Sequence, residues 1–242
     1  MRSESMPKVI AMIPARIGSK RVPKKNLRII NGQPLISYSI AAAVASNVFD
    51  AIYINSDAEI FSEFADNKQV HFYKRPEELG SDETNNDQFV SDFMSNIKGD
   101  ILIQLLPTSP LITPEEISGF VNEMIRQEYD TLISVIDIQI ACVYKYAPLN
   151  FKLLEPHIPS QLMIPVQAYA TVLMGWSYKS FCTNMNRYGF AYHGADSKIG
   201  YYPLKGFSEI DIDNEEDFEL AEIALRYRNS NEKKNKRVYY EK

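Results

Sequence analysis

The sequence predicts an α/β fold with a mostly parallel sheet and helices on both of its faces. Up to residue 138, short apolar runs typical of buried strands alternate with segments whose apolar residues have helical spacing. The chain has 242 residues, of which 45% are hydrophobic and 24% charged, and this suits one large domain. We therefore expect a single domain over residues 1–228 and a polar C-terminal tail over residues 229–242.

Strand and helix signals alternate through the first half of the chain. Strands are expected at residues 9–13, 51–54, 70–73, 100–106 and 131–138, and a short extended piece at 27–30 ends in an Asn31-Gly32 turn. Helices are expected at 35–45 after Pro34, around 60–64 with Ser56 or Asp57 as the cap, and across 89–97. Another helix begins at Thr113, where Pro114 and Glu116 complete a capping box.

The pattern changes after residue 138. Residues 139–174 contain short apolar runs and prolines without a clear helical period, and we interpret them as a mainly β excursion that carries a second surface. A helix is then expected over 178–185, a strand over 189–193, and a final helix from 215 to about 227.

Composition excludes several classes of protein. The net charge of −5 argues against a general nucleic-acid surface. No apolar run is long enough to span a bilayer and no N-terminal signal is recognisable, so we expect no membrane association and a cytoplasmic location. Cys142 and Cys182 lie far apart in apolar or aromatic surroundings and are expected in the core. The three histidines have no metal-ligand spacing.

The loop after the first strand carries the strongest chemical signal. Five cations lie within ten residues, namely Arg16, Lys20, Arg21, Lys24 and Lys25. Gly18 allows the backbone to approach a ligand and present N–H groups, so the loop is suited to a polyphosphate. The alternative is a solvated basic turn. The loop is neither a Walker A motif nor a dinucleotide fingerprint, because the required glycines and the Gly-Lys-Ser/Thr order are missing.

Other polar segments follow the expected strands. Residues 55–57 and 104–109 come directly after apolar runs, as the cationic loop does. Ligands of parallel sheets bind at the carboxyl ends of the strands. We therefore expect these three segments to converge in one crevice.

Asp211 and Asp213 form a second chemical signal. We expect them at the end of a strand, where residues two apart point to the same face. Two such carboxylates repel unless a cation lies between them, and Mg²⁺ binds one or two carboxylates together with phosphate oxygens. The alternative is that Asp213 caps the following helix. Combined with the cationic loop, the pair indicates transfer of a phosphoryl or nucleotidyl group.

The chain resembles the CMP-N-acetylneuraminate synthetase family, the cytidylyltransferases that activate sialic-acid-like sugars. The resemblance is carried by Ile13-Pro14-Ala15-Arg16 with Gly18-Ser19-Lys20 and residues 23–26, by Arg75-Pro76 with Leu79 and Asp82, by Gln104 with residues 107–111, and by residues 210–213 with Asp217. These matches run from residue 8 to about 225.

The resemblance implies a Rossmann-like nucleotidyltransferase fold with a smaller dimerisation element at 139–174, and a homodimer. It implies that CTP and a nonulosonic acid give a CMP-sugar and pyrophosphate with Mg²⁺ or Mn²⁺, for surface glycan biosynthesis. By similarity, Arg16 and Lys20 would hold the triphosphate, and Asp211 and Asp213 the metal, which makes these four the expected catalytic set. The expected nucleotide-binding residues are Ala15, Arg16, Gly18, Ser19, Lys20, Lys25, Asn26, Arg75, Asn85 and Asn86, and those for the sugar acid are Gln104, Gln161 and Tyr169.

The sugar half departs from the family pattern. Residues 157–165 lack the usual Arg before Gln161, and Ala170-Thr171 stands where many members have Asn-Gly. This favours an acid of the pseudaminic or legionaminic type over N-acetylneuraminate. The alternatives are a 3-deoxy-octulosonate cytidylyltransferase, against which the Lys25-Asn26 ending argues, an enzyme for a sugar 1-phosphate, and a non-catalytic nucleotide-binding relative.

Overall fold

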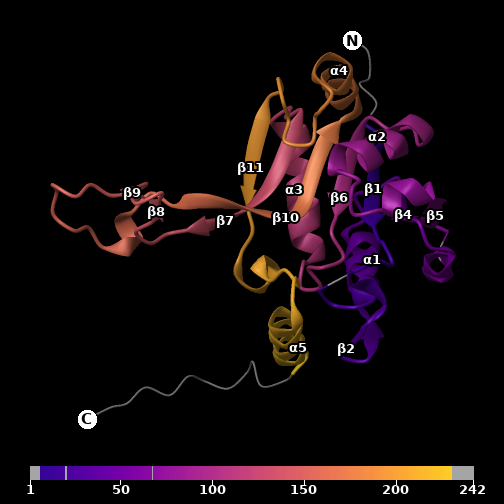
Figure 1. The fold of residues 1–242 in the computed structure, drawn as a ribbon, viewed down its shortest axis with the longest axis horizontal. Coiled ribbons are helices and arrows are strands. Elements are labelled where there is room, and N and C mark those ends of the chain that lie inside the picture. Colours follow the sequence, from indigo (N-terminus) through magenta and orange to yellow (C-terminus); the bar gives the residue numbers. More distant parts are fainter. Residues whose placement is uncertain (1–5, 20, 67, 231–242) are drawn as a thin grey trace.

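A central sheet organises the chain (Figure 1), and the computed structural model describes residues 6–19, 21–66 and 68–230. The strand order is β11-β7-β10-β6-β1-β4-β5. The strands are β1 (Val9–Pro14), β4 (Ala51–Ser56), β5 (Val70–Lys74), β6 (Ile101–Leu105), β7 (Thr131–Ile138), β10 (Val166–Ser177) and β11 (Ile199–Pro203). β10 runs antiparallel to both neighbours and all other pairs in the sheet are parallel. The predicted mostly parallel α/β fold is confirmed.

Helices cover both faces of the sheet, as expected. α1 (Leu35–Ser46) and α3 (Pro114–Arg126) pack on one face, while α2 (Asn86–Asn96) and α4 (Tyr178–Tyr188) pack on the other. β1 shows why the strands are apolar throughout: Ala11 and Ile13 face the first pair of helices, and Ile10 and Met12 face the second.

A third apolar cluster joins the two ends of the domain. α5 (Glu215–Asn229) packs on the hairpin of β2 (Ile29–Ile30) and β3 (Gln33–Pro34), which turns at Asn31 and Gly32, both at positive φ. Asn214 caps α5 in a capping box. Arg28 contacts Glu215 and lies over the Phe218 ring at 4.2 Å, so the start of α5 is tied to the segment just before β2.

An arm projects from the sheet at the left of Figure 1. β7 and β10 continue past the other strands, with Ile138 paired to Val166, and residues 139–165 lie between them. The arm contains β8 (Val143–Tyr144), β9 (Ala147–Pro148) and the 3-10 turn η4 (Ser160–Leu162). The second half of β10 returns into the sheet after a bulge between Tyr169 and Met174, where Thr171 has a φ of 54°.

Several local predictions are wrong. Residues 189–193 do not form a strand, because Gly189 ends α4 in the left-handed conformation and the chain then turns. The edge strand β11 was not predicted. The segment around 60–64 is a 3-10 turn, η2 (Glu59–Phe64), whose N-cap is Ala58, and not a helix capped by Ser56 or Asp57. Cys142 is half-buried and Cys182 exposed, so neither belongs to the core.

The remaining short turns are η1 (Lys25–Leu27), η3 (Glu77–Gly80) and η5 (Gly206–Glu209). Within residues 6–19, 21–66 and 68–230, no helix combines the length and apolar character needed to cross a membrane. The predicted polar tail lies outside the described residues from position 231 onward, and Asn229 is the last residue of α5.

Candidate active site

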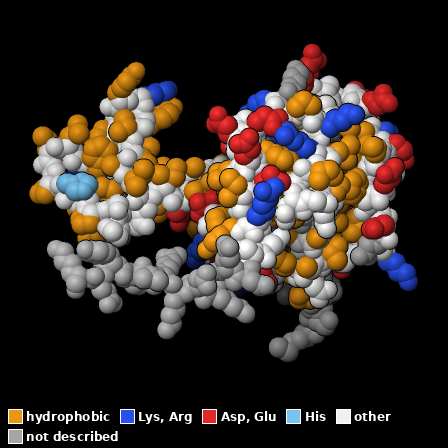
Figure 2. Space-filling model, turned by 90° about the horizontal axis from the view of Figure 1, so that it is seen from below, with side chains coloured by type: hydrophobic (Ala, Val, Ile, Leu, Met, Phe, Trp, Pro, Cys, Tyr) orange, Lys and Arg blue, Asp and Glu red, His pale blue; other side chains and the backbone are white. Residues whose placement is uncertain are grey.

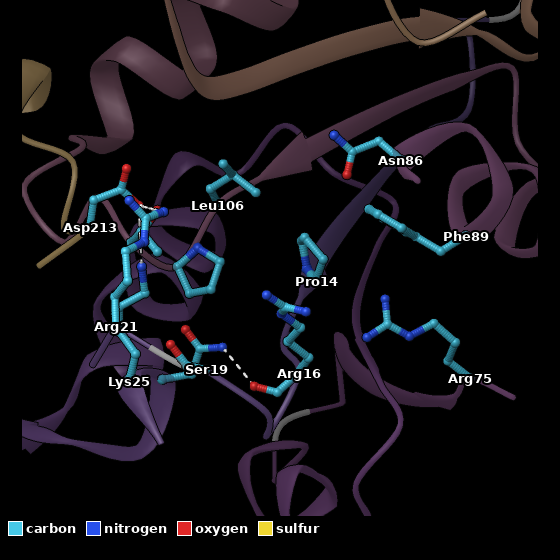
Figure 3. Close-up of a pocket in the computed structure, with 13 residues that line it drawn as sticks. Pro14, Arg16, Ser19, Arg21, Lys25, Arg75, Asn86, Phe89, Leu106 and Asp213 are labelled. Carbon is cyan, nitrogen blue, oxygen red and sulfur yellow. Dashed lines mark hydrogen bonds and ion pairs between the residues drawn. The ribbon is translucent and has the colours of Figure 1, made fainter. Parts of the chain in front are cut away.

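A cavity of about 400 Å³ opens at the carboxyl ends of β1 and β6 (Figure 3). The strand order reverses between these two strands, because β4 and β5 follow on one side of β1 and β6 lies on the other. Ligands of open α/β sheets bind at such a point. The lining residues are Pro14, Arg16, Ser19, Arg21, Lys25, Asn26, Arg75, Asn86, Phe89, Leu106, Pro107, Thr108 and Asp213. Two of the three segments expected to converge, the cationic loop and the stretch after β6, therefore do so.

The loop after β1 forms the cationic wall. The backbone N–H of Ala15 donates to the carbonyl of Asn55 at 2.9 Å, so the loop leaves the sheet beside β4. The side chain of Asn26 donates to the Arg16 carbonyl at 3.3 Å, which closes the loop on itself. Ser19 lines the cavity and Gly18 is exposed next to it. Lys20 lies outside the described residues.

Cations of this loop meet the acidic segment that precedes α5. Arg21 Nη2 lies 2.9 Å from Asp213 Oδ1, and Lys25 Nζ lies 3.7 Å from the same oxygen. Lys25 also donates to the carbonyl of Ile212. Burial lowers the pKa of Lys25, and the charge of Asp213 opposes this shift. The cavity thus holds a partly desolvated ammonium group beside a carboxylate.

The acidic segment is an extended loop, so the predicted strand at Asp211 and Asp213 is wrong. The alternation is nevertheless present: Ile212 is fully buried against α5, and the two carboxylates on either side of it are partly exposed. The N–H of Ile212 donates to the Thr108 carbonyl at 2.9 Å, which joins this loop to the end of β6. Asn214, and not Asp213, caps α5, so the capping alternative is also wrong.

Asp213 lines the cavity, and Asp211, two residues before it, does not. Ser109 Oγ donates to Asp211 Oδ1 at 3.4 Å. Burial raises the pKa of Asp211, and the negative charge of Asp213 adds to the effect. In the part of the chain that the structure describes, no three or more His, Cys, Asp or Glu side chains are placed so that they alone could hold a metal ion. These two carboxylates fit a hard cation that takes its other ligands from phosphate and water.

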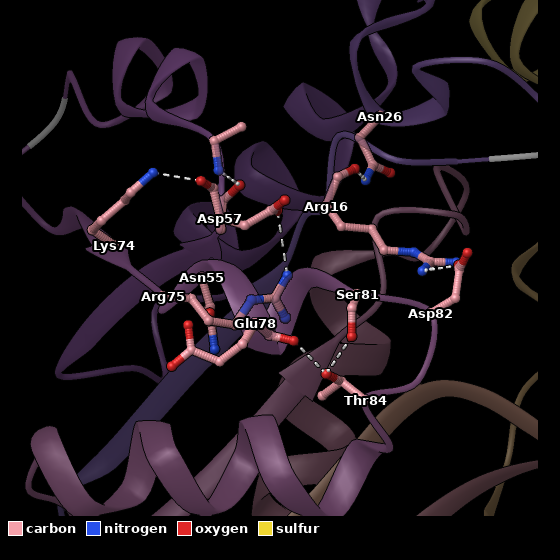
Figure 4. A network of polar contacts seen from close by, with 12 residues as sticks. Arg16, Asn26, Asn55, Asp57, Lys74, Arg75, Glu78, Ser81, Asp82 and Thr84 are labelled. Carbon is pink, nitrogen blue, oxygen red and sulfur yellow. Dashed lines mark hydrogen bonds and ion pairs between the residues drawn. The ribbon is translucent and has the colours of Figure 1, made fainter.

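The opposite wall is built around Arg75, which follows β5. Its side chain is buried, its guanidinium carbon lies 5.2 Å from the Phe89 ring centroid, and it is directed toward the cavity (Figure 3). Arg75 Nη2 lies 3.6 Å from Asp57 Oδ1 (Figure 4). Burial lowers the pKa of Arg75, and Asp57 opposes this shift.

Arg16 stands between the two walls. Its guanidinium donates to Asp82 Oδ1 at 2.7 Å, and both side chains are 44% exposed. Contacts of this kind contribute little to stability. Arg16 is therefore held toward the second wall by a weak pair that an anionic ligand can replace.

Six of the predicted nucleotide residues line the cavity, namely Arg16, Ser19, Lys25, Asn26, Arg75 and Asn86, whereas Gly18 does not line it and Lys20 lies outside the described residues. Ala15 is fully buried behind the loop, and Asn85 is the N-cap of α2, where its side chain accepts from the Gln88 N–H. Neither lines the cavity, whereas Asn86 does.

The three predicted sugar residues lie apart from one another. Gln104 on β6 is fully buried and donates to the Tyr192 hydroxyl at 3.0 Å. Tyr169 stands at the base of the arm, 5.6 Å from the His193 ring. Gln161 is exposed on the arm, where its carbonyl accepts from Gln139 at 3.2 Å.

Some site residues were missed by sequence reasoning. Arg21 was counted among the cations but given no site role, and Phe89 was assigned only to a helix. Asp57 was expected in the crevice with residues 55 and 56, or as a helix cap, but its contact with Arg75 was not predicted. Its position after an apolar strand, next to a strand that Arg75 follows, was the available signal.

Two N-acylneuraminate cytidylyltransferases are similar to this chain in sequence. The chain is 27% identical to the N-acylneuraminate cytidylyltransferase of Escherichia coli over 93% of its own length and 54% of that protein. It is 30% identical to the N-acylneuraminate cytidylyltransferase of Streptococcus agalactiae over 54% of its length and 33% of that protein. The chain thus spans about half, or less, of the length of these relatives.

Solved structures share the fold. A CMP:2-keto-3-deoxy-manno-octonic acid synthetase complexed with CTP superposes with a TM-score of 0.64 at 14% identity, over 91% of this chain and 99% of the other. A 4-diphosphocytidyl-2C-methyl-D-erythritol synthase from Anaerococcus prevotii gives a TM-score of 0.62 at 11% identity, over 90% and 96% of the two chains. Both agree with the predicted Rossmann-like nucleotidyltransferase fold. Residues 10–241 match the family described as cytidylyltransferase, and the chain belongs to that family.

Proposed function

We propose that the protein transfers CMP from CTP to the hydroxyl of a nonulosonic acid, giving a CMP-sugar and pyrophosphate. The observation that carries this proposal is the cavity at the end of β1, where Arg16, Arg21, Lys25 and Arg75 converge with Asp213. The names of the relatives support a sialic-acid-like acceptor.

The cations answer the main electrostatic problem of this reaction. CTP and a sugar acid are both anionic, so their approach is opposed unless positive charge lies at the site. Lys25 is partly desolvated, which strengthens its attraction to a phosphate. Arg16 offers a planar fork for two phosphate oxygens once it leaves Asp82.

Asp211 and Asp213 would hold the metal, for which we propose Mg²⁺ or Mn²⁺. When bound, such an ion neutralises charge that develops on the phosphates. In the ligand-free protein, Arg21 and Lys25 lie beside Asp213 and offset its charge. Binding of the metal therefore requires these cations to turn toward the phosphates.

The sugar would bind on the face of the sheet that α2 and α4 cover, near the base of the arm where Tyr169 lies. Tyr169 lies near the rings of His193 and Tyr201, with centroid distances of 5.6 and 6.2 Å. Such rings can pack on the apolar parts of an acylated sugar. We propose an acid of the pseudaminic or legionaminic type, and a role in surface glycan biosynthesis in the cytoplasm, where CTP is available.

We also propose that the arm forms a homodimer. Figure 2 shows hydrophobic side chains gathered over the arm. Its exposed apolar residues are Ile140, Val143, Tyr144, Tyr146, Leu149, Leu153, Leu154, Ile158, Leu162 and Ile164. A patch of this kind on a protein surface marks an interaction site, and light scattering at micromolar concentration would test whether a second copy covers it.

The function is tested by pyrophosphate release with CTP and Mg²⁺ against a panel of nonulosonic acids. 3-Deoxy-octulosonate and a sugar 1-phosphate serve as alternative acceptors. Release with one nonulosonic acid is expected. Turnover only with 3-deoxy-octulosonate would favour that alternative, and CTP binding without release on any acceptor would favour a non-catalytic relative.

A further inference from the structure

Arg75 is a buried cation that is not fully satisfied within the protein. Its side chain is 3% exposed, and among the described residues its Nε has no hydrogen-bond partner. An unpaired buried donor is costly, and it is more so on a charged group. Because Arg75 also lines the cavity, the outer nitrogens of its guanidinium can donate to a ligand that accepts hydrogen bonds there.

Asp57 lies beside this guanidinium because of the way two strands pair. β4 and β5 are parallel neighbours with Ser56 opposite Lys74, and the Arg75 N–H donates to the Ser56 carbonyl at 2.8 Å. Asp57 follows Ser56 and Arg75 follows Lys74, so Asp57 and Arg75 lie next to each other. The distance of 3.6 Å between Arg75 Nη2 and Asp57 Oδ1 is longer than a hydrogen bond. The Asp57 carboxylate thus attracts the Arg75 guanidinium by charge and leaves the guanidinium N–H groups free to donate to a ligand.

Gly80 holds the Asp57 carboxylate in place. A Cβ atom on Gly80 would lie 2.7 Å from Cβ, Cγ and Oδ2 of Asp57, which is closer than atoms can approach. The backbone at the end of η3 therefore packs directly on the carboxylate. On the other side, the Lys74 ammonium donates to the Asp57 carbonyl (Figure 4).

We propose that Asp57 is a positioning residue that acts through Arg75 and fixes its fork for the nucleobase. The inference rests on the proposed function, because the base in question is that of CTP. Cytosine presents two adjacent acceptors, O2 and N3, to a planar donor fork, whereas uracil presents a donor at N3. A guanidinium held in one orientation can donate to both O2 and N3 of cytosine. With uracil, one of its N–H groups would face the N3–H donor.

The test is a double-mutant cycle on nucleotide affinity. CTP and UTP are titrated by calorimetry into wild type, Asp57→Asn, Arg75→Gln and the double variant, without sugar. Asp57→Asn is expected to weaken CTP binding about tenfold, since one partner of a buried charge pair is lost, and to reduce the preference for CTP over UTP. In the Arg75→Gln background the same change is expected to alter CTP affinity less than about twofold.

Kinetics give a second readout that a purely structural role would not produce. The KM for CTP is expected to rise by the same factor as the dissociation constant, while kcat stays within about threefold, because the lost interaction concerns binding. A fall in kcat at unchanged KM would overturn the proposal.

Gly80→Ala tests the same idea without removing a charge. Its methyl group would displace the Asp57 carboxylate, and weaker CTP binding is expected in the same direction as for Asp57→Asn. Asp92→Asn is the matched control, because that carboxylate also acts on Arg75 through its charge but accepts from the Tyr73 hydroxyl at 2.7 Å. CTP affinity is expected to remain within about twofold in this variant.

The outcomes separate this inference from the function on which it rests. If wild type binds CTP and the effects of Asp57→Asn and Arg75→Gln add, Asp57 does not act through Arg75. If wild type binds no nucleotide, both proposals fail. If Asp57→Asn does not fold, the decision passes to Gly80→Ala, and an unchanged CTP affinity there overturns the inference.

Discussion

In the cavity, charged side chains from distant parts of the sequence lie against one another, whereas the arm exposes apolar side chains that find few neighbours in their own chain. Arg21 and Asp213 are far apart in sequence and 2.9 Å apart in space. Leu154 on the arm is fully exposed. The single chain thus assembles most of its polar site by itself, whereas the apolar surface of its arm is left for a partner molecule to cover. Each of the following predictions tests one side of this difference.

The largest effect is expected in the cavity. Arg16→Ala and Asp211→Ala should each reduce pyrophosphate release by roughly 10²–10³-fold, because the first removes a cation that would hold the triphosphate and the second removes a carboxylate that would hold the metal. Circular dichroism should show a folded protein in both. Arg187→Ala, which removes a surface partner of Asp196, is the control. Near-normal release in Arg16→Ala would contradict the role of the loop.

The arm is expected to control assembly and not nucleotide binding. The double change Leu153→Glu with Leu154→Glu places charge on its exposed apolar surface and should give a monomer by light scattering. CTP affinity should stay within about twofold, because the cavity lies on the sheet. Ile60→Glu changes an exposed apolar residue of η2 and should leave the mass unaltered. A monomeric wild type would show that the arm serves another partner.

Without ligand, the buried Asp211 carboxylate is expected to lower the free energy of unfolding. Burial raises the pKa of Asp211, so the folded protein holds this proton more tightly than the unfolded chain does. Its stabilising contribution is complete below the unfolded pKa of about 3.9 and is lost as the pH rises through the raised folded pKa. Asp211→Asn should therefore unfold at a higher urea concentration than wild type at pH 7, although it is inactive.

This gain should shrink as the pH falls through the folded pKa of Asp211, because the wild-type carboxyl is then protonated as well. Asp196→Asn, at an exposed acid, is the control and should not raise the urea midpoint at pH 7. Equal urea midpoints for wild type and Asp211→Asn at pH 7 would show that the buried charge is already compensated.

The smallest effect is expected where the arm meets the sheet. Thr171 has a φ of 54°, a left-handed conformation that is unfavourable for a β-branched residue. Thr171→Gly should raise the free energy of unfolding by about 1 kcal/mol, since glycine adopts this conformation without strain. Thr183→Gly, on the exposed side of α4, should lower it by a similar amount. Destabilisation by Thr171→Gly would show that the bulge depends on the threonine side chain.

Sequence reasoning succeeded where the decisive contacts are local. The capping box at Thr113 and Glu116 and the strand at 131–138 have signals within a few residues, and both are present in the structure. It failed where partners are remote. The direction of β10 depends on its pairing with β6 and β7, and no periodicity reports that direction.

The same limit applies to the site. The expected strand ends predicted where the cavity lies, but they did not predict which side chains face it. Gln104 turns away to Tyr192, 88 positions later, and Asp57 turns to Arg75 because β4 and β5 are neighbours. The prediction that both cysteines lie in the core failed for a related reason. Apolar neighbours in the sequence suggested burial, but Cys182 lies on the exposed side of α4.

The pairing of Ile138 with Val166 makes the whole arm a single long connection between two adjacent antiparallel strands. A two-residue turn joins such strands in ordinary hairpins. The arm is thus removable in principle: a chain in which a tight turn replaces residues 139–165 keeps every strand of the central sheet. Quaternary structure and nucleotide chemistry would then be separately adjustable, because the arm joins the sheet through the β7–β10 ladder.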